Sequence, residues 1–408
     1  MKGKKVKLHY PAINMNKNRF IRMILNNPAN IFPIVFWNCR MLILKLLGYK
    51  TIIYNIHYDY FFDIFLPVYE KLILDKRIKI YFSWLSTNKI LKNHLINMIG
   101  KKRLISNIIS PYILTDLFIT GENNGPDFPF SHFPTRKIQI YHGTGVYTHY
   151  RKADVLSRFD IHFAIGPLYI PFINSLPCKG EKNSNLRIVG YPKLDKVIEP
   201  DPALVSYLTD LYGINDKFVI LYTPHWNEFG SLHVLGLDIT KNLSQIAENV
   251  VVLIKVHNFL FTEFKEQNWH KKLSDLQNKF RNIKIVSRPN TQEVYPLGDM
   301  LITDTGTTAA LEYSLTRKPL FVFFNQGWFD HHNNTEVEMD IVNTSITFTT
   351  ISEIVQYAKE VYTKQPDMMK KLAAQSAKQL ILTNNNLFNP GKATNIACQI
   401  IIEELGIS

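Results

Sequence analysis

The chain has only three cysteines among its 408 residues, and Cys39, Cys178 and Cys398 lie far apart in the sequence. They form no Cys-x-x-Cys pair and no even set of regular spacing, so the sequence offers no disulfide framework. Scattered, reduced thiols of this kind are typical of cytosolic proteins. We therefore expect the protein in the cytoplasm.

Common motifs of phosphate-binding and metal-binding loops are also missing. The chain has no Gly-x-x-x-x-Gly-Lys-Ser/Thr sequence, which excludes a P-loop NTPase. The segment 329–340 is rich in histidine and carboxylate side chains, but it has neither His-Glu-x-x-His nor another familiar zinc spacing. We interpret this segment as a polar loop and expect no metal site.

A long, purely apolar run is absent as well. The basic N-terminus MKGKKVKLHY is not followed by the apolar region of a signal peptide. The most apolar early segment, residues 30–50, contains Arg40 and Lys45, which interrupt a membrane-spanning helix. Residues 1–49 are therefore predicted to form a basic, amphipathic segment. It either lies on the inner face of the cell membrane or packs as an ordinary core helix.

Acidic residues are fewer than basic residues. Lys and Arg number 47 against 34 Asp and Glu, which gives a net charge of +13. A basic surface suits nucleic acid, anionic lipid or a phosphorylated substrate. The basic residues are dispersed and no nucleic-acid-binding signature is present, so a nucleic-acid binder is not favoured. A hydrophobic content of 46% indicates a globular protein, and the length allows two domains.

Short β-rich runs alternate with helical patterns along most of the chain. KTIIYNI, IKIYFSW, DLFITG, KIQIYHG, FDIHFAIG and LRIVGY form a first series, and FVILYTPH, VVVLIKVH, IKIVSRP, DMLITDTG and PLFVFF form a second. Such alternation predicts βα units and parallel sheets. We expect two Rossmann-like α/β domains, residues 50–200 and 201–385, followed by a C-terminal helical segment, residues 386–408.

Polar side chains gather where these predicted strands end. Ligands of open parallel sheets bind beyond the carboxyl ends of the strands. His, Thr and Arg at such positions suit a phosphate-bearing ligand, because they donate hydrogen bonds and can carry positive charge. The residues at the predicted strand ends are His57 and His142 in the first half, and Thr223, His225, His257, Arg288 and Asp304 in the second.

The segment Asp304–Thr308, DTGTT, joins a predicted strand to a predicted helix. By itself it fits a tight turn in which a threonine caps the helix. Backbone N–H groups and hydroxyls at a helix N-terminus also bind phosphate. Because several neighbouring strands end in phosphate-compatible residues, we favour the phosphate site.

Six segments, in order, resemble motifs of the CDP-glycerol glycerophosphotransferases that build teichoic acids and related capsule polymers. IYHGTGVYT resembles the Trp-His-Gly-Thr motif of that family, VGYPKLDKV its Gly-x-Pro-Arg-x-Asp, and VLIKVH its Arg-x-His-Pro. ILYTPHWNE, NTQEVYPLGDMLITDTGTTAALEY and NPGKATNIACQII resemble three further motifs. The resemblance runs from about Lys50 to the C-terminus. It implies a GT-B-like fold, with two Rossmann-type domains across a cleft and a C-terminal helix that returns toward the N-terminal domain.

The resemblance also implies a reaction. A hydroxyl of a cell-surface polymer or glycolipid attacks the phosphorus that carries glycerol, and CMP leaves. His142 would take the hydroxyl proton, and His257 would contact the phosphate or protonate the leaving group. The absence of Asp-x-Asp fits an enzyme that needs neither metal nor cofactor. On the donor side we expect Thr223, His225, Arg288, Asp304, Thr305, Gly306, Thr307, Thr308 and Glu312, the last for ribose hydroxyls. On the acceptor side we expect His57, Gly143, Thr144 and His149.

Other functions remain open from the sequence. Gly306 and Thr307 stand where the resembled family usually has Tyr and Ser, and a small-residue loop followed by a glutamate also occurs in GT-B glycosyltransferases that use nucleotide sugars. Such a glycosyltransferase, in capsule or lipopolysaccharide synthesis, is the main alternative. A nucleotide-sugar epimerase on the same scaffold is a second alternative, and it would need no polymer acceptor.

Overall fold

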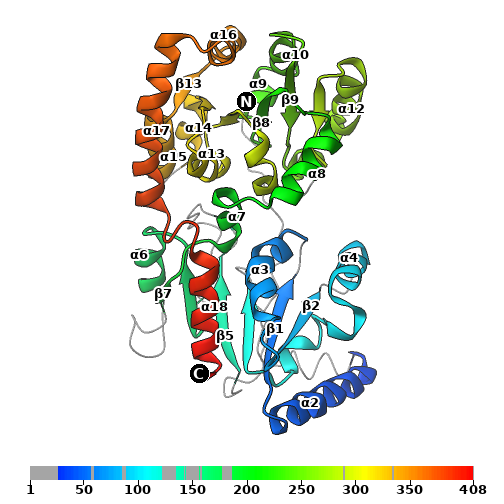
Figure 1. Cartoon of the computed structure of the whole chain (residues 1–408). Helices are drawn as coiled ribbons and strands as arrows, with labels where there is room; N and C mark the ends of the chain where they lie inside the picture. The colour runs from blue at the N-terminus through cyan, green and yellow to red at the C-terminus, as the bar shows by residue number, and fades with distance from the viewer. Residues whose placement is uncertain are drawn as a thin grey trace.

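Two open parallel sheets follow one another along the chain (Figure 1). The structure is a computed structural model that describes residues 26–56, 59–84, 89–121, 135–141, 143, 156, 159–176, 186–287, 290–332 and 335–407. Every strand pair in these residues is parallel. The predicted α/β class with two Rossmann-type sheets is confirmed.

The first sheet has the strand order β3-β2-β1-β4-β5-β6-β7. Its central strands are mostly apolar because both faces are covered. Ile52 and Ile53 of β1 point to opposite faces and are both fully buried. The strands are β1 (Lys50–Ile56), β2 (Ile78–Trp84), β3 (Leu104–Ser106), β4 (Leu117–Thr120), β5 (Arg136–Ile140), β6 (Ile161–Ala164) and β7 (Leu186–Ile188). The helices of this half are α2 (Ile31–Leu46), α3 (Asp59–Leu72), α4 (Lys89–Ile99), α6 (Tyr169–Asn174) and α7 (Asp195–Ile198).

The second sheet has the order β10-β9-β8-β11-β12-β13. Its strands are β8 (Phe218–Thr223), β9 (Val250–Ile254), β10 (Ile283–Ile285), β11 (Met300–Asp304), β12 (Leu320–Phe323) and β13 (Ile346–Phe348). Between and after them lie α9 (Ser231–Val234), α10 (Asp238–Ser244), α11 (Phe259–Glu263), α12 (Trp269–Lys279), α13 (Ala309–Tyr313), α14 (Gln326–His331), α15 (Glu336–Thr344) and α16 (Ile351–Tyr362).

Helix α8 (Pro202–Tyr212) leads from the first half to the second. The Asp201 carboxylate accepts a hydrogen bond from the Ala203 N–H and caps the helix at its start. Gly213 ends it with φ 63°, a left-handed conformation that favours glycine. The domain boundary predicted between residues 200 and 201 thus falls directly before this helix.

The chain crosses back to the first half through α17 (Pro366–Asn386) and α18 (Ala393–Glu404). Helix α18 packs on α3, where the Cys398 thiol lies 3.7 Å from the Val68 carbonyl oxygen. The crossing needs glycine at Gly190, because φ is +96° and a Cβ there would lie 2.2 Å from the Phe388 carbonyl oxygen. The C-terminal helix therefore returns to the N-terminal half as predicted (Figure 1).

Candidate active site

The candidate site lies at the carboxyl edge of the second sheet, where β8 and β11 are neighbours. From β8 the chain proceeds outward to β9 and β10, whereas from β11 it proceeds the opposite way to β12 and β13. Loops that leave two adjacent strands in opposite directions open a crevice, which is the usual ligand position in such sheets. Thr223 ends β8 and Asp304 ends β11, so these two predicted residues flank the crevice.

Asp304 holds the loop that follows β8. Its Oδ2 accepts hydrogen bonds from the backbone N–H groups of His225 at 2.7 Å and Ser231 at 2.9 Å. Its Oδ1 accepts one from the Ser231 hydroxyl. The side chain is only 1% exposed, and this burial raises the pKa of Asp304 to about 7 despite the three donors. Asp304 thus shapes the crevice from beneath through contacts within the protein.

The DTGTT turn is packed tightly against α14. The Thr305 N–H and hydroxyl both donate to the Phe323 carbonyl oxygen, at 3.0 and 2.8 Å. Gly306 has φ +87°, and a Cβ there would lie 2.4 Å from the Trp328 ring. Glycine is therefore required by the backbone conformation and by the neighbouring indole. Thr305 and Gly306 fix the turn, which leaves Thr307 and Thr308 as its partly exposed members.

The Thr307 hydroxyl belongs to a directed chain of hydrogen bonds. Thr303 Oγ1 donates its hydrogen to the Thr223 carbonyl oxygen at 2.8 Å. In the 2.9 Å contact between the Thr303 and Thr307 hydroxyls, the donor must therefore be Thr307. A phosphate oxygen can receive that hydrogen only if Thr307 releases Thr303. Helix α13 has five residues, so its dipole contribution to anion binding is small.

Two histidines present the same tautomer at the ends of neighbouring strands. Nδ1 of His225 accepts from the Asn227 N–H at 3.2 Å, and Nδ1 of His257 accepts from the Phe259 N–H at 3.1 Å. The hydrogen of each neutral ring is then on Nε2. Burial lowers the pKa of His225 to about 3.

His257 differs from His225 because its side chain is exposed. Desolvation by the surrounding protein and then the Lys255 ammonium lower the pKa of His257. Both imidazoles are neutral at pH 7 and act as Nε2–H donors.

Lys255 lies at the end of β9, and its ammonium also faces a cation of the first half. Burial is the main cause that lowers the pKa of Lys255, to about 8, and Lys193 lowers it further. The carboxylates of Asp63, Glu312 and Glu293 partly offset the charge of Lys193, so a polyanion would pair mainly with Lys255. Neither lysine was among the predicted site residues. Both stand at the arginine positions of resembled motifs, in VGYPKLDKV and VLIKVH, and this was the signal that could have identified them.

Glu312 lies inside the protein, not on a solvated helix face. It is 4% exposed and accepts hydrogen bonds from Gln292 Nε2 and, at 3.1 Å, from the Tyr295 hydroxyl. Burial raises the pKa of Glu312, and the Lys193 ammonium is the largest opposing influence. This carboxylate of the second half therefore lies close to a cation that the first half contributes.

Lys193 is held at this position by the motif around it. It belongs to the 3-10 helix η5 (Pro192–Leu194), and Asp195 follows. The Asp195 carboxylate accepts from the backbone N–H groups of Ala393 at 3.3 Å and Thr394 at 2.7 Å. Asp195 thus caps α18 and ties the segment that carries Lys193 to the C-terminal helix.

Of the remaining predicted residues, two are described by the structure and five lie outside the described residues. Thr223 is 5% exposed, and its hydroxyl makes no hydrogen bond in the described structure. Gly143 follows β5, and its carbonyl oxygen accepts from the Tyr169 hydroxyl of α6. Outside the described residues lie His57, His142, Thr144, His149 and Arg288. Within the described residues, no three His, Cys, Asp or Glu side chains are grouped so that they could hold a metal ion.

Comparison with known proteins identifies the family. The sequence model of the CDP-glycerol:poly(glycerophosphate) glycerophosphotransferases matches residues 177–387, a little over half of the chain. That range includes all six strands of the second sheet and most of the crevice residues. No curated protein sequence matches the chain.

Solved structures show the same fold. The wall teichoic acid polymerase TagF is 17% identical, with a TM-score of 0.64 over 96% of this chain and 98% of its own. A TagF variant gives 0.65 at 14% identity over the same shares. S. aureus MnaA in complex with UDP is 15% identical, with a TM-score of 0.52 over 88% of this chain and 98% of its own. These structures show the shared two-sheet fold, and because the family model matches more than half of the residues, the chain belongs to the CDP-glycerol:poly(glycerophosphate) glycerophosphotransferase family.

Proposed function

We propose that this protein transfers glycerol phosphate, or a related polyol phosphate, from a CDP-activated donor to a hydroxyl group of a cell-surface polymer or glycolipid, with release of CMP. The observation that carries the proposal is the family match, which spans the crevice between β8 and β11. The alternative, transfer of a sugar from a nucleotide sugar, would use the same crevice and differs in the donor.

The donor diphosphate is proposed to lie over the ends of β8, β9 and β11. Lys255 supplies positive charge, and the Nε2–H groups of His225 and His257 supply hydrogen bonds without carrying charge in the free protein. Thr307 and Thr308 line the same crevice on the β11 side. Hydrogen bonds to charged groups are the stronger class, which favours donors placed around phosphate oxygens.

The transfer step requires one base. The acceptor oxygen forms a bond to the phosphorus that carries glycerol, and the bond from that phosphorus to the CMP oxygen breaks. His142 is proposed to take the proton of the acceptor hydroxyl. A bound diphosphate would raise the pKa of His257, because negative charge stabilises the imidazolium. His257 would then stabilise the charge that develops on CMP, or protonate it.

A panel of donors tests the reaction. CDP-glycerol, CDP-ribitol and UDP-sugars are supplied separately, with and without a polyol-phosphate acceptor, and CMP, UMP and UDP release is measured. We expect acceptor-dependent CMP release from a CDP-activated polyol. Lys255→Gln should reduce kcat/KM roughly 10- to 150-fold, which is the effect of one hydrogen bond to a charged group.

Lys271→Gln is the matched control, because it removes the same charge from an exposed site on α12, away from the crevice. Release of UDP from a UDP-sugar, without CMP release from any CDP-polyol, would establish the glycosyltransferase instead.

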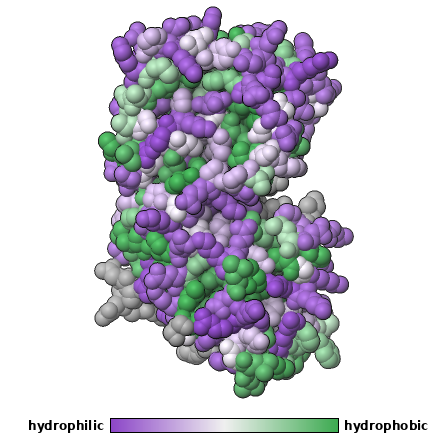
Figure 2. All heavy atoms as spheres, in the orientation of Figure 1, coloured by the Kyte–Doolittle hydropathy of each residue, from purple (hydrophilic) through white to green (hydrophobic). Residues whose placement is uncertain are grey.

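The N-terminal helix supports a further part of the proposal, contact with the membrane surface. Pro28–Leu46 is the one helix among the described residues that is long and apolar enough, by length and composition, to cross a membrane. The basic residues inside it had argued against such a span. One face of α2 packs on the first sheet through Met41 and Trp37. The opposite face is exposed and apolar, at the lower end of the molecule in Figure 2.

We propose that this exposed face lies in the lipid interface and brings the enzyme to an anionic, membrane-linked acceptor. Its exposed apolar residues are Ile31, Phe32, Val35, Phe36, Leu42, Ile43, Leu46 and Leu47. Phe32 is 82% exposed and Phe36 is 60% exposed. Burial of each aromatic ring in lipid contributes about 1.5–3 kcal/mol to the free energy of membrane binding. Basic residues near an anionic surface add about 1 kcal/mol each.

Vesicle sedimentation tests this contact. The wild-type protein should bind vesicles that contain anionic lipid, and added salt should weaken the binding. Phe32→Glu/Phe36→Glu should abolish it. The control is Leu380→Glu/Ile381→Glu, which changes two similarly exposed apolar residues on α17 and should leave binding unchanged. Equal loss in both double variants, or no binding at low salt, would refute the membrane role of α2.

A further inference from the structure

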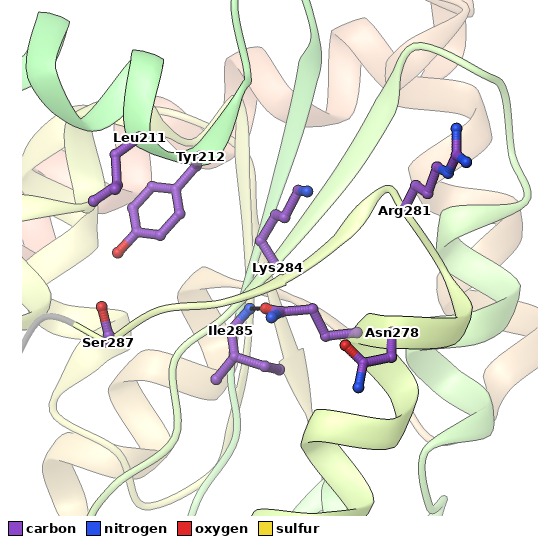
Figure 3. A pocket seen from close by; sticks show the side chains of 8 residues that line it. Leu211, Tyr212, Asn278, Arg281, Lys284, Ile285 and Ser287 are labelled. Carbon is purple, nitrogen blue, oxygen red and sulfur yellow. Dashed lines mark hydrogen bonds between the residues drawn. The ribbon is translucent and has the colours of Figure 1, made fainter.

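A second polar cavity lies on the outer side of the second sheet, apart from the crevice between β8 and β11. It has a volume of about 470 Å³ and is bounded by the end of α8, the end of α12 and the edge strand β10 (Figure 3). Its lining is mostly polar: Tyr212, Gln277, Asn278, Arg281, Lys284 and Ser287, with Leu211 and Ile285 as the apolar members. The family match and the proposed transfer step assign no role to it.

The charge of the cavity is positive and uncompensated. Lys284 is the middle residue of β10 and Arg281 precedes the strand, and neither forms an ion pair with a described carboxylate. Among the described residues, no Asp or Glu lines the cavity. Two cations that share one depression without a counter-charge repel each other, and an anion that contacts both relieves this repulsion.

A buried hydroxyl provides an independent sign of a ligand. Tyr212 is 6% exposed, and its hydroxyl has no hydrogen-bond partner among the residues that the structure describes. In Figure 3 this hydroxyl points toward the side of the cavity where Ser287 lies. A buried polar group without a partner destabilises the protein, so such groups are rare unless a ligand or water forms a hydrogen bond with them.

Amide groups complete the polar lining. Gln277 lines the cavity, and its Oε1 accepts a hydrogen bond from the Ile285 N–H at 2.7 Å. Asn278 contributes a second amide. Cations combined with hydroxyls and amides match a ligand that alternates phosphate with hydroxyl-bearing carbon, because phosphate takes the charged donors and hydroxyls take the neutral ones.

We infer that this cavity binds a phosphodiester-linked polyol chain, the acceptor polymer, at a point removed from the reacting end. The inference rests on the proposed function. Ser287, two residues past β10, places one end of the cavity at the carboxyl edge of the sheet, where the crevice lies, whereas the ends of α8 and α12 bound the cavity toward the amino edge. A long acceptor with its reacting end beside the donor would reach the cavity first at Ser287. Binding there would hold a long acceptor and leave a short acceptor unaffected.

Steady-state kinetics with two acceptors tests the inference. One acceptor carries a single glycerol phosphate unit, and the other is a long oligo(glycerol phosphate). Arg281→Gln/Lys284→Gln should raise KM for the long acceptor at least about tenfold, with kcat and the KM of the short acceptor unchanged. Lys271→Gln/Lys279→Gln is the control, because it removes two exposed charges from α12 outside the cavity.

Tyr212→Phe separates the hydroxyl from the charges. It should raise KM for the long acceptor without lowering the melting temperature, because no described residue is a hydrogen-bond partner of the hydroxyl. An unchanged KM in the Arg281/Lys284 double variant, or an equal rise with both acceptors, would overturn the inference. So would an equal rise in the control double variant.

A binding measurement without donor keeps this result separate from the proposed reaction. Calorimetric titration of the long oligo(glycerol phosphate) should show weaker binding to the Arg281/Lys284 double variant than to the control variant. The wild-type protein could turn over no CDP-polyol while the double variant still bound the oligomer more weakly than the control variant. The proposed function would then be refuted, and the assignment of the cavity as a binding site for the oligomer would be supported. If anionic lipid vesicles, and not the oligomer, lost affinity for the double variant, the cavity would be a lipid headgroup site and the inference would be wrong.

Discussion

Replacement of Asp304 by asparagine should change how the stability of the protein depends on pH. Asparagine has the same shape, and its oxygen can accept from the two backbone N–H groups that Asp304 Oδ2 now serves. Its NH₂ group can donate to the Ser231 hydroxyl, which can in turn donate to the Tyr222 hydroxyl 2.7 Å away. The loop after β8 should therefore keep its conformation, and the variant loses mainly the ionisable group.

The sign of the effect follows from the raised pKa. In the folded protein the pKa of Asp304 is about 7, against 3.8 for the ordinary group. Between these values the folded state holds the proton and the unfolded state has lost it, so this carboxyl makes stability fall as pH rises. Across the window the loss amounts to about 4 kcal/mol, at about 1.4 kcal/mol for each pH unit.

Urea unfolding of both proteins at a series of pH values measures the difference. The stability of Asp304→Asn relative to wild type should rise by up to about 4 kcal/mol between about pH 4 and pH 8. Burial also raises the pKa of Glu338 to about 7, but both proteins share that group and it cancels. A stability difference that does not change with pH would refute the reasoning, because the three hydrogen bonds would then have offset the cost of burial.

Three further changes test the site. His142→Ala should reduce transfer by about 10²–10⁴-fold while CDP binding stays nearly intact, and more than about a tenth of wild-type activity would exclude the base role. Thr307→Val should lower stability by about 1 kcal/mol, through the lost bond to Thr303, and should weaken CDP binding roughly fivefold in calorimetry. A lowered melting point with unchanged affinity would limit Thr307 to the turn. Gly306→Ala should lower the melting point, because the left-handed backbone costs about 1–2 kcal/mol and the new Cβ displaces Trp328. If Gly306→Ala melted at the same temperature as the wild-type protein, the turn would tolerate a side chain at this position.

The strands that the sequence predicts are those with long apolar runs. KTIIYNI coincides with β1, the run KIQIYHG starts one residue after the first residue of β5, and the other quoted runs contain β2, β4 and β6 to β12. Two strands were missed, β3 (Leu104–Ser106) and β13 (Ile346–Phe348), and both are three-residue strands at a sheet edge. An edge strand of this length needs no sustained apolar run, since its pairing with one neighbour is decided by the rest of the sheet.

Residue type and position in the chain identified most of the crevice, because strand ends in a parallel sheet must meet at one edge. Thr223, His225, His257 and Asp304 all lie at such ends. The roles within that edge were not predictable in the same way. Asp304 was expected to face the donor, whereas its oxygens bind a loop of the protein.

The sequence by itself determined the α/β class, the two series of parallel strands and the edge at which the site lies, because each depends on local apolar patterns and on the direction of parallel strands. Only the tertiary structure decided which donor groups are already paired within the protein and which are left to bind a ligand. The Asp304 carboxylate is committed to the N–H groups of His225 and Ser231, and the Lys193 ammonium from the other half of the chain opposes the rise in the pKa of Glu312. These interactions join segments that are distant in sequence, and no local pattern specifies which distant group will be the partner.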